Sequence, residues 1–198
     1  ALEGPGDLVG ARPIIVVAQA GKNRLESLGD VEESADLLRY YSLQVEENNG
    51  YIKPLQKLSN NEDTRSVLKP YGVFAVIAPF NFPAALSAGM SAGALLGGNA
   101  VILKSSRETP WSGRMLFETF RDAGIPEGVF QLVQGTGGEI GDALTHDKRV
   151  NGVVFTGSKE VGLPLLQLYS KPPFAKPCFL ELGGKNPAII TKNANLEI

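Results

Sequence analysis

Several classes of protein are excluded by what the sequence lacks. Its 198 residues include one cysteine, Cys178, and one histidine, His146, so an internal disulfide is impossible and a zinc or iron–sulfur site built from these residue types is practically excluded. The 19 basic and 21 acidic side chains nearly cancel, which predicts no attraction toward nucleic acid or an anionic membrane. No apolar run approaches the roughly 20 residues that span a bilayer. A small-molecule partner is favoured.

The composition that remains is that of a soluble globular protein. Hydrophobic residues make up 43% and charged residues 20% of the chain, while 23 glycines and 13 prolines indicate many tight loops. The length suits one main domain, or one domain with a fragment of a neighbour. Residues 1–13 lack the charged and apolar regions of a secretion signal, and with the single cysteine this favours the reducing cytoplasm.

The apolar pattern predicts an α/β fold. Residues 31–47 place apolar side chains on one face of a helix, and residues 50–70 read as a hairpin or arm that stands off the core. Five short apolar runs then alternate with helical segments. We expect strands at residues 73–78, 100–103, 129–133, 153–155 and 179–182, and helices at 84–96, 111–123, 139–144 and 160–169. Because the first run lacks alternation, it indicates a doubly wound parallel sheet, Rossmann-like, covered on both faces.

In such a sheet, ligands bind at the carboxyl ends of the strands. After the first strand, Asn81 is confined by prolines and aromatic residues, so its amide could stabilise a developing oxyanion; equally, it could cap the helix near Ala84. After the second strand, Lys104, Ser106 and Arg107 could hold a ribose or phosphate, or form a solvated strand end.

Two glycine-rich segments follow the third and fourth strands. Residues 135–141 form a Gly-x-Gly-x-x-x-Gly run, one residue longer than the common dinucleotide fingerprint. In residues 156–162, Thr156 and Ser158 could cap a helix whose N–H groups bind pyrophosphate. The following Leu163 and Pro164 do not match a phosphate-binding P-loop, which disfavours a kinase or nucleoside triphosphatase.

The fifth strand ends with a carboxylate between two leucines. Desolvation of Glu181 there would raise its pKa and suit it to general-base work. Alternatively, Glu181 is the partner of Lys185 or of a helix terminus.

Four segments, taken in order, resemble signatures of the aldehyde dehydrogenase superfamily. They are Pro-Phe-Asn-Phe-Pro at 79–83, Gly-Asn-Ala-Val-Ile-Leu-Lys at 98–104, Phe-Thr-Gly-Ser at 155–158 and Glu-Leu-Gly-Gly-Lys at 181–185. The resemblance runs from about Gly21 to Ile198 and implies oxidation of an aldehyde to an acid with NAD or NADP, through thiolate attack, hydride transfer and thioester hydrolysis. Residues 1–13 match nothing in it.

The resemblance also implies roles for single residues. Asn81 corresponds to the oxyanion-stabilising amide and Glu181 to the base that activates the deacylating water. Lys104 corresponds to the residue that holds the adenosine ribose. The implied cofactor site comprises Ala78, Pro79, Phe80, Lys104, Ser106, Arg107, Gly137, Gly141, Phe155, Thr156, Gly157, Ser158, Gly162, Leu182 and Gly183; no metal site is implied. Gly157, Gly162 and Gly183 would permit close approach of the backbone to the cofactor.

The chain departs from the family pattern in two respects. The family's nucleophilic cysteine would lie beyond Ile198, and Cys178, expected within the fifth strand, is interpreted as a small buried hydrophobe; the chain alone is therefore expected to be inactive. Arg107 stands where many NAD-preferring members carry a glutamate. Since it could pair with a 2′-phosphate, we expect NADP to be accepted as well as NAD.

The resemblance extends to organisation. Residues 21–24, 36–41 and 48–51 resemble the branch that contains 1-pyrroline-5-carboxylate dehydrogenases, and the arm at about 50–70 resembles the family's oligomerisation hairpin, which implies a homo-oligomer of the intact protein. We expect residues 1–185 to hold the amino-terminal helix, the arm and the NAD(P)-binding domain, and residues 186–198 to begin an incomplete catalytic domain. The alternative is a short non-catalytic protein that binds a nucleotide or a partner.

Overall fold

The computed structural model describes residue 16 and residues 18–171 and 173–195. Residues 1–13, whose origin the sequence leaves open, lie outside this range. The main helices are α2 (Arg24–Glu47), α3 (Ala85–Leu96), α4 (Pro110–Asp122), α5 (Asp142–His146) and α6 (Lys159–Tyr169). The strands are β1 (Ile52–Pro54), β2 (Arg65–Val67), β3 (Val73–Ile77), β4 (Ala100–Lys104), β5 (Phe130–Val133), β6 (Val150–Gly157) and β7 (Cys178–Leu182).

Five of these strands form one parallel sheet, in the order β5-β4-β3-β6-β7. The chain builds outward from β3 to β5 on one side, then returns to place β6 and β7 on the other side. The expected doubly wound α/β fold is confirmed. The order in which successive strands are added reverses between β3 and β6. In open α/β sheets, ligands bind in a crevice at such a point.

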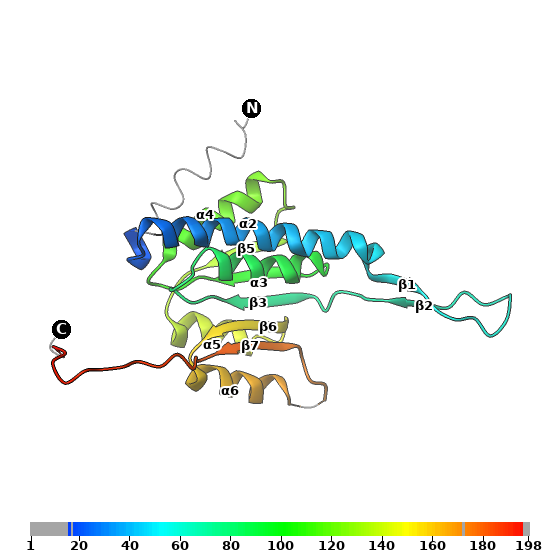
Figure 1. The fold of residues 1–198 in the computed structure, drawn as a ribbon. Helices are drawn as coiled ribbons and strands as arrows, with labels where there is room; N and C mark the ends of the chain where they lie inside the picture. The colour runs from blue at the N-terminus through cyan, green and yellow to red at the C-terminus, as the bar shows by residue number, and fades with distance from the viewer. Residues whose placement is uncertain (1–15, 17, 172, 196–198) are drawn as a thin grey trace.

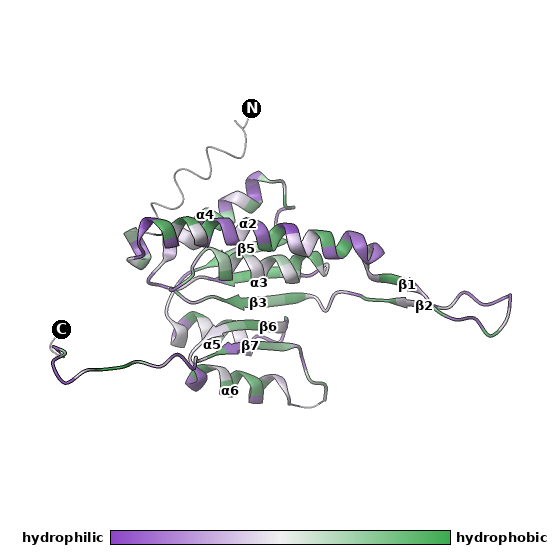
Figure 2. Cartoon of the chain, in the orientation of Figure 1, coloured by the Kyte–Doolittle hydropathy of each residue, from purple (hydrophilic) through white to green (hydrophobic). Residues whose placement is uncertain are grey.

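Helices cover both faces of the sheet (Figure 1). On one face, Phe74 and Val76 of β3 pack with Phe120 of α4 and Phe130 of β5. On the other face, the core contains Val153 and Phe155 of β6 with Leu165 and Tyr169 of α6. Figure 2 shows β3 as hydrophobic along its length, whereas α2, which packs on α3, also carries hydrophilic residues. A strand buried on both faces has no need of alternation, as its sequence indicated.

The arm is a two-stranded antiparallel hairpin in which Ile52 pairs with Val67 and Pro54 with Arg65. Both strands are exposed, and the hairpin projects from the body of the molecule (Figure 1). The predicted arm is present.

Some boundaries differ from the sequence expectation. Helix α2 begins at Arg24 rather than Val31, because Asn23 caps it by accepting a hydrogen bond from the Glu26 amide at 2.9 Å. Its first turns leave Leu25 79% exposed, so no apolar stripe marks them. The helix expected at 139–144 is a π-helical turn, η2 (Gly137–Gly141), followed by α5.

At the far end of the chain, β7 is an edge strand. The described residues that follow it, 183–195, contain no helix or strand and leave Ile189 89% exposed. Among the helices described, none is both long and apolar enough to cross a membrane.

Substituting Tyr169 tests the core beneath α6. The residue is 3% exposed, its hydroxyl donates to the Thr145 carbonyl at 3.2 Å, and burial raises the pKa of Tyr169 to about 12. We expect Tyr169→Phe to lower the free energy of unfolding by about 1 kcal/mol at neutral pH. Denaturant titration measures this, with the exposed Tyr40→Phe as the control.

The same pair tests the pH dependence. The phenol ionises near pH 10 when unfolded but near 12 when folded, so its neutral form is favoured in the native state. The unmodified chain should therefore lose stability as the pH rises from about 10 to about 12, and Tyr169→Phe should lose less. Identical alkaline slopes would contradict this assignment.

Candidate active site

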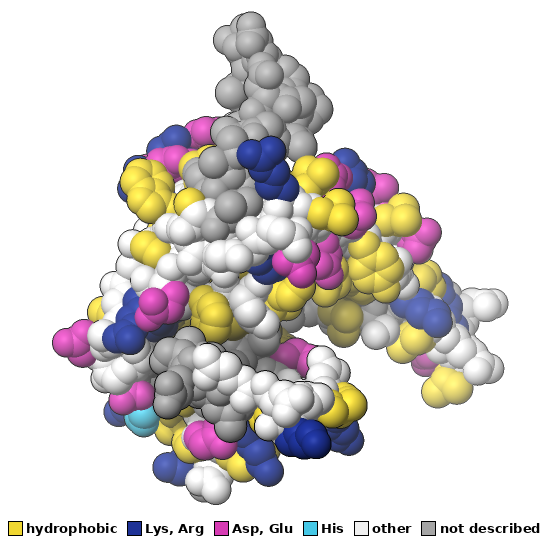
Figure 3. Space-filling view, turned by 60° about the vertical axis from the view of Figure 1, so that its left-hand side comes forward, with side chains coloured by type: hydrophobic (Ala, Val, Ile, Leu, Met, Phe, Trp, Pro, Cys, Tyr) yellow, Lys and Arg dark blue, Asp and Glu magenta, His cyan; other side chains and the backbone are white. Residues whose placement is uncertain are grey.

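The predicted site residues converge on the carboxyl edge of the sheet because the strands are parallel and in register. Ile77 at the end of β3 pairs with Lys104 of β4 and with Phe155 of β6, while Gly157 pairs with Leu182 of β7. The segments that follow β3, β4, β6 and β7 therefore start side by side. Lys/Arg and Asp/Glu side chains are interspersed over the face shown in Figure 3.

Asn81 lies in an exposed turn after β3, between Phe80 and Phe82. It does not cap α3, so that alternative is wrong. The cap comes from α2: Asp30 accepts hydrogen bonds from the amides of Ala85 at 2.8 Å and Ala84 at 3.5 Å. The Asn81 side chain thus makes no capping hydrogen bond at the start of α3, and its amide remains a candidate oxyanion donor.

Lys104 is the last residue of β4 and is only 6% exposed, which excludes a solvated strand end at this position. Its ammonium donates to the Ser105 carbonyl at 3.2 Å. Burial lowers the pKa of Lys104, and the charge of Arg107 lowers it further. Lys104 can direct its remaining N–H donors toward a ligand.

The next residues are more exposed. Arg107 forms an ion pair with Glu108 at 2.7 Å, with both side chains more than half exposed. The Ser106 hydroxyl accepts from the Glu108 amide at 3.2 Å. An exposed pair of this type contributes little to stability, so Arg107 can exchange Glu108 for an anionic ligand at small cost.

Of the two predicted caps in the fourth segment, one is present. Ser158 is the N-cap of α6 and accepts from the Val161 amide at 3.4 Å. Thr156 lies within β6, where its hydroxyl contacts the Met90 sulfur at 3.4 Å, because β6 extends to Gly157. The α6 amino terminus therefore opens at the sheet edge beside β7, with N–H groups suited to a phosphate.

The glycines of this region serve packing more than was expected. A Cβ at Gly162 would lie 2.3 Å from the Leu182 side chain, and one at Gly157 would lie 2.5 Å from the Phe155 ring. Close packing of α6 on β7 thus accounts for Gly162. Gly183 has φ +68 and open space around it, and Gly137 and Gly141 have no atom within 4 Å of an added Cβ.

Glu181 departs from the expected desolvated setting. In the described chain it is exposed on β7, because Cys178, Leu180 and Leu182 face the α6 side and leave Glu181 and Phe179 on the open side. Within the described residues it has neither an ion pair with Lys185 nor a hydrogen bond to a helix terminus, so both forms of that alternative are wrong. The carboxylate is accessible to water or a ligand at the sheet edge.

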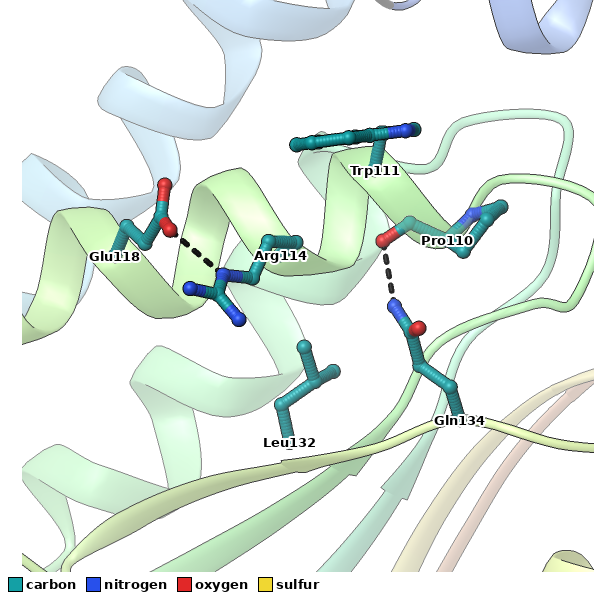
Figure 4. A pocket seen from close by; sticks show the side chains of 6 residues that line it. All are labelled: Pro110, Trp111, Arg114, Glu118, Leu132 and Gln134. Carbon is teal, nitrogen blue, oxygen red and sulfur yellow. Dashed lines mark hydrogen bonds and ion pairs between the residues drawn. The ribbon is translucent and has the colours of Figure 1, made fainter.

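A pocket that the sequence did not indicate lies between α4 and β5 (Figure 4). Its volume is about 660 Å³, and its lining is Pro110, Trp111, Arg114, Glu118, Leu132 and Gln134. Gln134 donates to the Pro110 carbonyl at 2.6 Å, and Arg114 pairs with Glu118 at 2.6 Å. The pocket contains none of the predicted site residues. Trp111 is 61% exposed, and its sequence context indicated only a helix, not a pocket.

Sequence reasoning also missed Asp30 and Lys22, since an acid in a helix normally reads as a solvated residue. Asp30 is fully buried, and its role as the cap of α3 is visible only from its short distance to the Ala85 amide in the folded chain.

Among the described residues, no three His, Cys, Asp or Glu side chains are grouped so as to hold a metal ion.

The chain is similar in sequence to a known family and to several known enzymes. The model of the aldehyde dehydrogenase family matches residues 14–198. The chain is 39% identical over 183 residues to a D-glyceraldehyde dehydrogenase (NADP(+)) of Picrophilus torridus, which covers 92% of this chain and 36% of the relative. It is 36% identical over 188 residues to a 1-pyrroline-5-carboxylate dehydrogenase of Bacillus cereus, with 93% and 36% covered.

A solved structure agrees in fold. The 1-pyrroline-5-carboxylate dehydrogenase from Thermus with bound NAD superposes with a TM-score of 0.83 at 34% identity, covering 90% of this chain and 36% of that one. The chain thus spans about a third of the length of the relatives that it matches.

Gly162 provides a test of the contact between α6 and β7. Alanine normally stabilises a helix relative to glycine by up to about 1 kcal/mol, but here its Cβ would overlap the Leu182 side chain. We expect Gly162→Ala to destabilise the chain by about 1–3 kcal/mol. The matched control is Gly93→Ala in α3, where no atom lies within 4 Å; it should stabilise the chain. Denaturant midpoints decide, and a gain in stability at both positions would contradict the packing.

Proposed function

Because the chain belongs to the aldehyde dehydrogenase family, we propose that it forms the NAD(P)-binding part of an enzyme that oxidises an aldehyde to a carboxylic acid. The observation that carries the proposal is the convergence of the Asn81, Lys104, Ser158 and Glu181 segments at one edge of the parallel sheet. No single one of these segments would indicate this function as specifically as the four together.

The donors at this edge fit a dinucleotide. Lys104 supplies a buried ammonium beside β4, suited to ribose hydroxyls, and the α6 amino terminus with Ser158 supplies N–H groups for the pyrophosphate. Gly137 is exposed, whereas Gly141 is buried, and at neither position does another group lie within 4 Å of an added Cβ. A bound NAD(P) would accept hydride from the substrate. We propose that the remaining predicted contacts, Ala78, Pro79, Phe80, Phe155, Thr156, Gly157, Gly162, Leu182 and Gly183, also border the cofactor.

The protein's own groups would act on the substrate and on water. The Asn81 amide would donate a hydrogen bond to the oxygen of the aldehyde as negative charge develops there. Glu181 would accept a proton from the water that releases the acid product. Its exposure at the open side of β7 leaves room for that water.

Cys178 is not proposed as the nucleophile. It lies inside β7 with its side chain turned to the α6 core, and burial raises the pKa of its thiol, which disfavours the thiolate. The chain spans about a third of the length of these relatives. We therefore propose that the reactive thiol belongs to the remainder of the whole enzyme, that residues 186–198 lead into that part, and that residues 1–198 alone are inactive.

Two further features belong to the whole enzyme. The exposed hairpin of β1 and β2 has unpaired edges that suit an intersubunit sheet, so we propose a homo-oligomer.

For the substrate, the names of the relatives supply two aldehydes to test first: D-glyceraldehyde and the semialdehyde in equilibrium with 1-pyrroline-5-carboxylate.

Cofactor preference is tested with Arg107. If its guanidinium meets a 2′-phosphate, the chain should bind NADP⁺ at least as tightly as NAD⁺. Arg107→Glu should then weaken NADP⁺ binding about tenfold or more, the loss of a charge-assisted hydrogen bond, and affect NAD⁺ less. Calorimetric titration of both cofactors measures this, with the exposed Arg121→Glu as control. A strong NAD⁺ preference of the unmodified chain would refute the role.

The activity is tested in the whole enzyme with Glu181→Gln. The unmodified enzyme should form NAD(P)H steadily with an aldehyde. The variant should retain a first burst of NAD(P)H but turn over on the order of 10²- to 10⁴-fold more slowly, because only the water-activating base is lost. Rapid-mixing absorbance separates the two phases. No reaction with any aldehyde by the unmodified enzyme would refute the proposed function and favour a non-catalytic binding protein.

A further inference from the structure

The start of α3 is held from a different part of the chain. Asp30 of α2 is fully buried and accepts hydrogen bonds from the Ala85 amide at 2.8 Å and the Ala84 amide at 3.5 Å. These N–H groups have no partner within their own helix. The position that would normally cap them, Ala84, has no suitable side chain. The orientation of the first turn of α3 therefore depends on Asp30.

Lys22 extends this contact to the turn that carries Asn81. Its ammonium nitrogen lies 3.7 Å from the Asp30 carboxylate and 3.1 Å from the centre of the Phe82 ring. The Lys22 side chain is only 11% exposed, and its nitrogen has no hydrogen-bond partner among the described residues. A buried cation is stabilised here by one carboxylate and one aromatic face.

These contacts anchor the chain directly after Asn81. Phe82, the next residue, is held by Lys22, and Ala84 and Ala85, three and four residues on, are held by Asp30. Asn81 itself is exposed and makes none of these contacts. An oxyanion donor is effective only when its direction is set before charge develops, and such direction requires a supporting shell of fixed groups.

We propose that Asp30 and Lys22 are positioning residues that set the direction of the Asn81 amide for the reaction. The role rests on the proposed function of Asn81, while the mechanical part does not. Both residues would act through the turn 81–85, which their contacts with Phe82, Ala84 and Ala85 support.

The mechanical part is tested on the chain itself by amide hydrogen exchange. Asp30→Ala should speed exchange at Ala84, Ala85 and Leu86 about tenfold or more and leave the strands β3, β4 and β6 protected. Asp30→Asn, which keeps one acceptor oxygen for Ala85, should recover part of the protection. Lys22→Met, which keeps the Asp30 carboxylate, should leave Ala85 protected. Asp36→Asn, on the exposed side of α2, is the matched control. Unchanged exchange at Ala84, Ala85 and Leu86 in Asp30→Ala would overturn the proposal.

The functional part is tested in the whole enzyme by a double-mutant cycle. Asp30→Ala should lower kcat about tenfold without changing the KM for NAD(P), and it should cause almost no further loss in an Asn81→Ala background. Lys22→Met, which keeps the Asp30 cap, serves as the second variant if Asp30→Ala does not fold. An equal loss of kcat in both backgrounds would overturn the positioning role, since a merely structural defect would act independently of Asn81.

The two experiments fail separately. If the whole unmodified enzyme oxidises no aldehyde, the proposed function falls and the catalytic part of this proposal falls with it. Faster exchange at Ala84, Ala85 and Leu86 in Asp30→Ala would then still establish Asp30 as the support of the turn.

Discussion

The pairing of β3 with parallel partners on both sides is the constraint on which the rest of the structure depends. Its last residue, Ile77, is in register with Lys104 on one side and with Phe155 on the other. Since parallel strands end at the same edge, the polar segments that follow them are brought together although as many as 100 residues of chain separate them (181 against 81). A different strand order would scatter the same motifs.

Close packing on both faces of the sheet makes that register specific. Gly152 of β6 leaves the space that the Phe74 ring of β3 fills, since a Cβ there would lie 2.4 Å from the ring. Gly162 does the same for Leu182 between α6 and β7. Small residues thus let large ones fill the core without voids, as native packing density requires. The glycines near the site are therefore explained partly by the core beneath it.

The amino-terminal helix has a larger part than a covering layer would have. Helix α2 packs along α3, and through Asp30 it supplies the acceptors that α3 lacks at its first turn. A buried carboxylate requires such donors, because its charge is costly to remove from water unless it is paired and hydrogen-bonded. The Asn81 turn is thereby coupled to residues about 50 positions earlier in the chain (81 against 30).

The sequence by itself determined the fold class, the approximate strands and the family, because apolar runs without alternation and ordered motifs are local patterns. It predicted that Ser158 begins a helix, and Ser158 does so. It left open whether Asn81 caps α3, and it placed Glu181 in a desolvated setting that the exposed side of β7 does not provide. Only the tertiary structure decided these points, because a cap and a burial depend on what approaches from elsewhere: Asp30 reaches α3 from another helix, and the open face of β7 has no neighbour in the described chain.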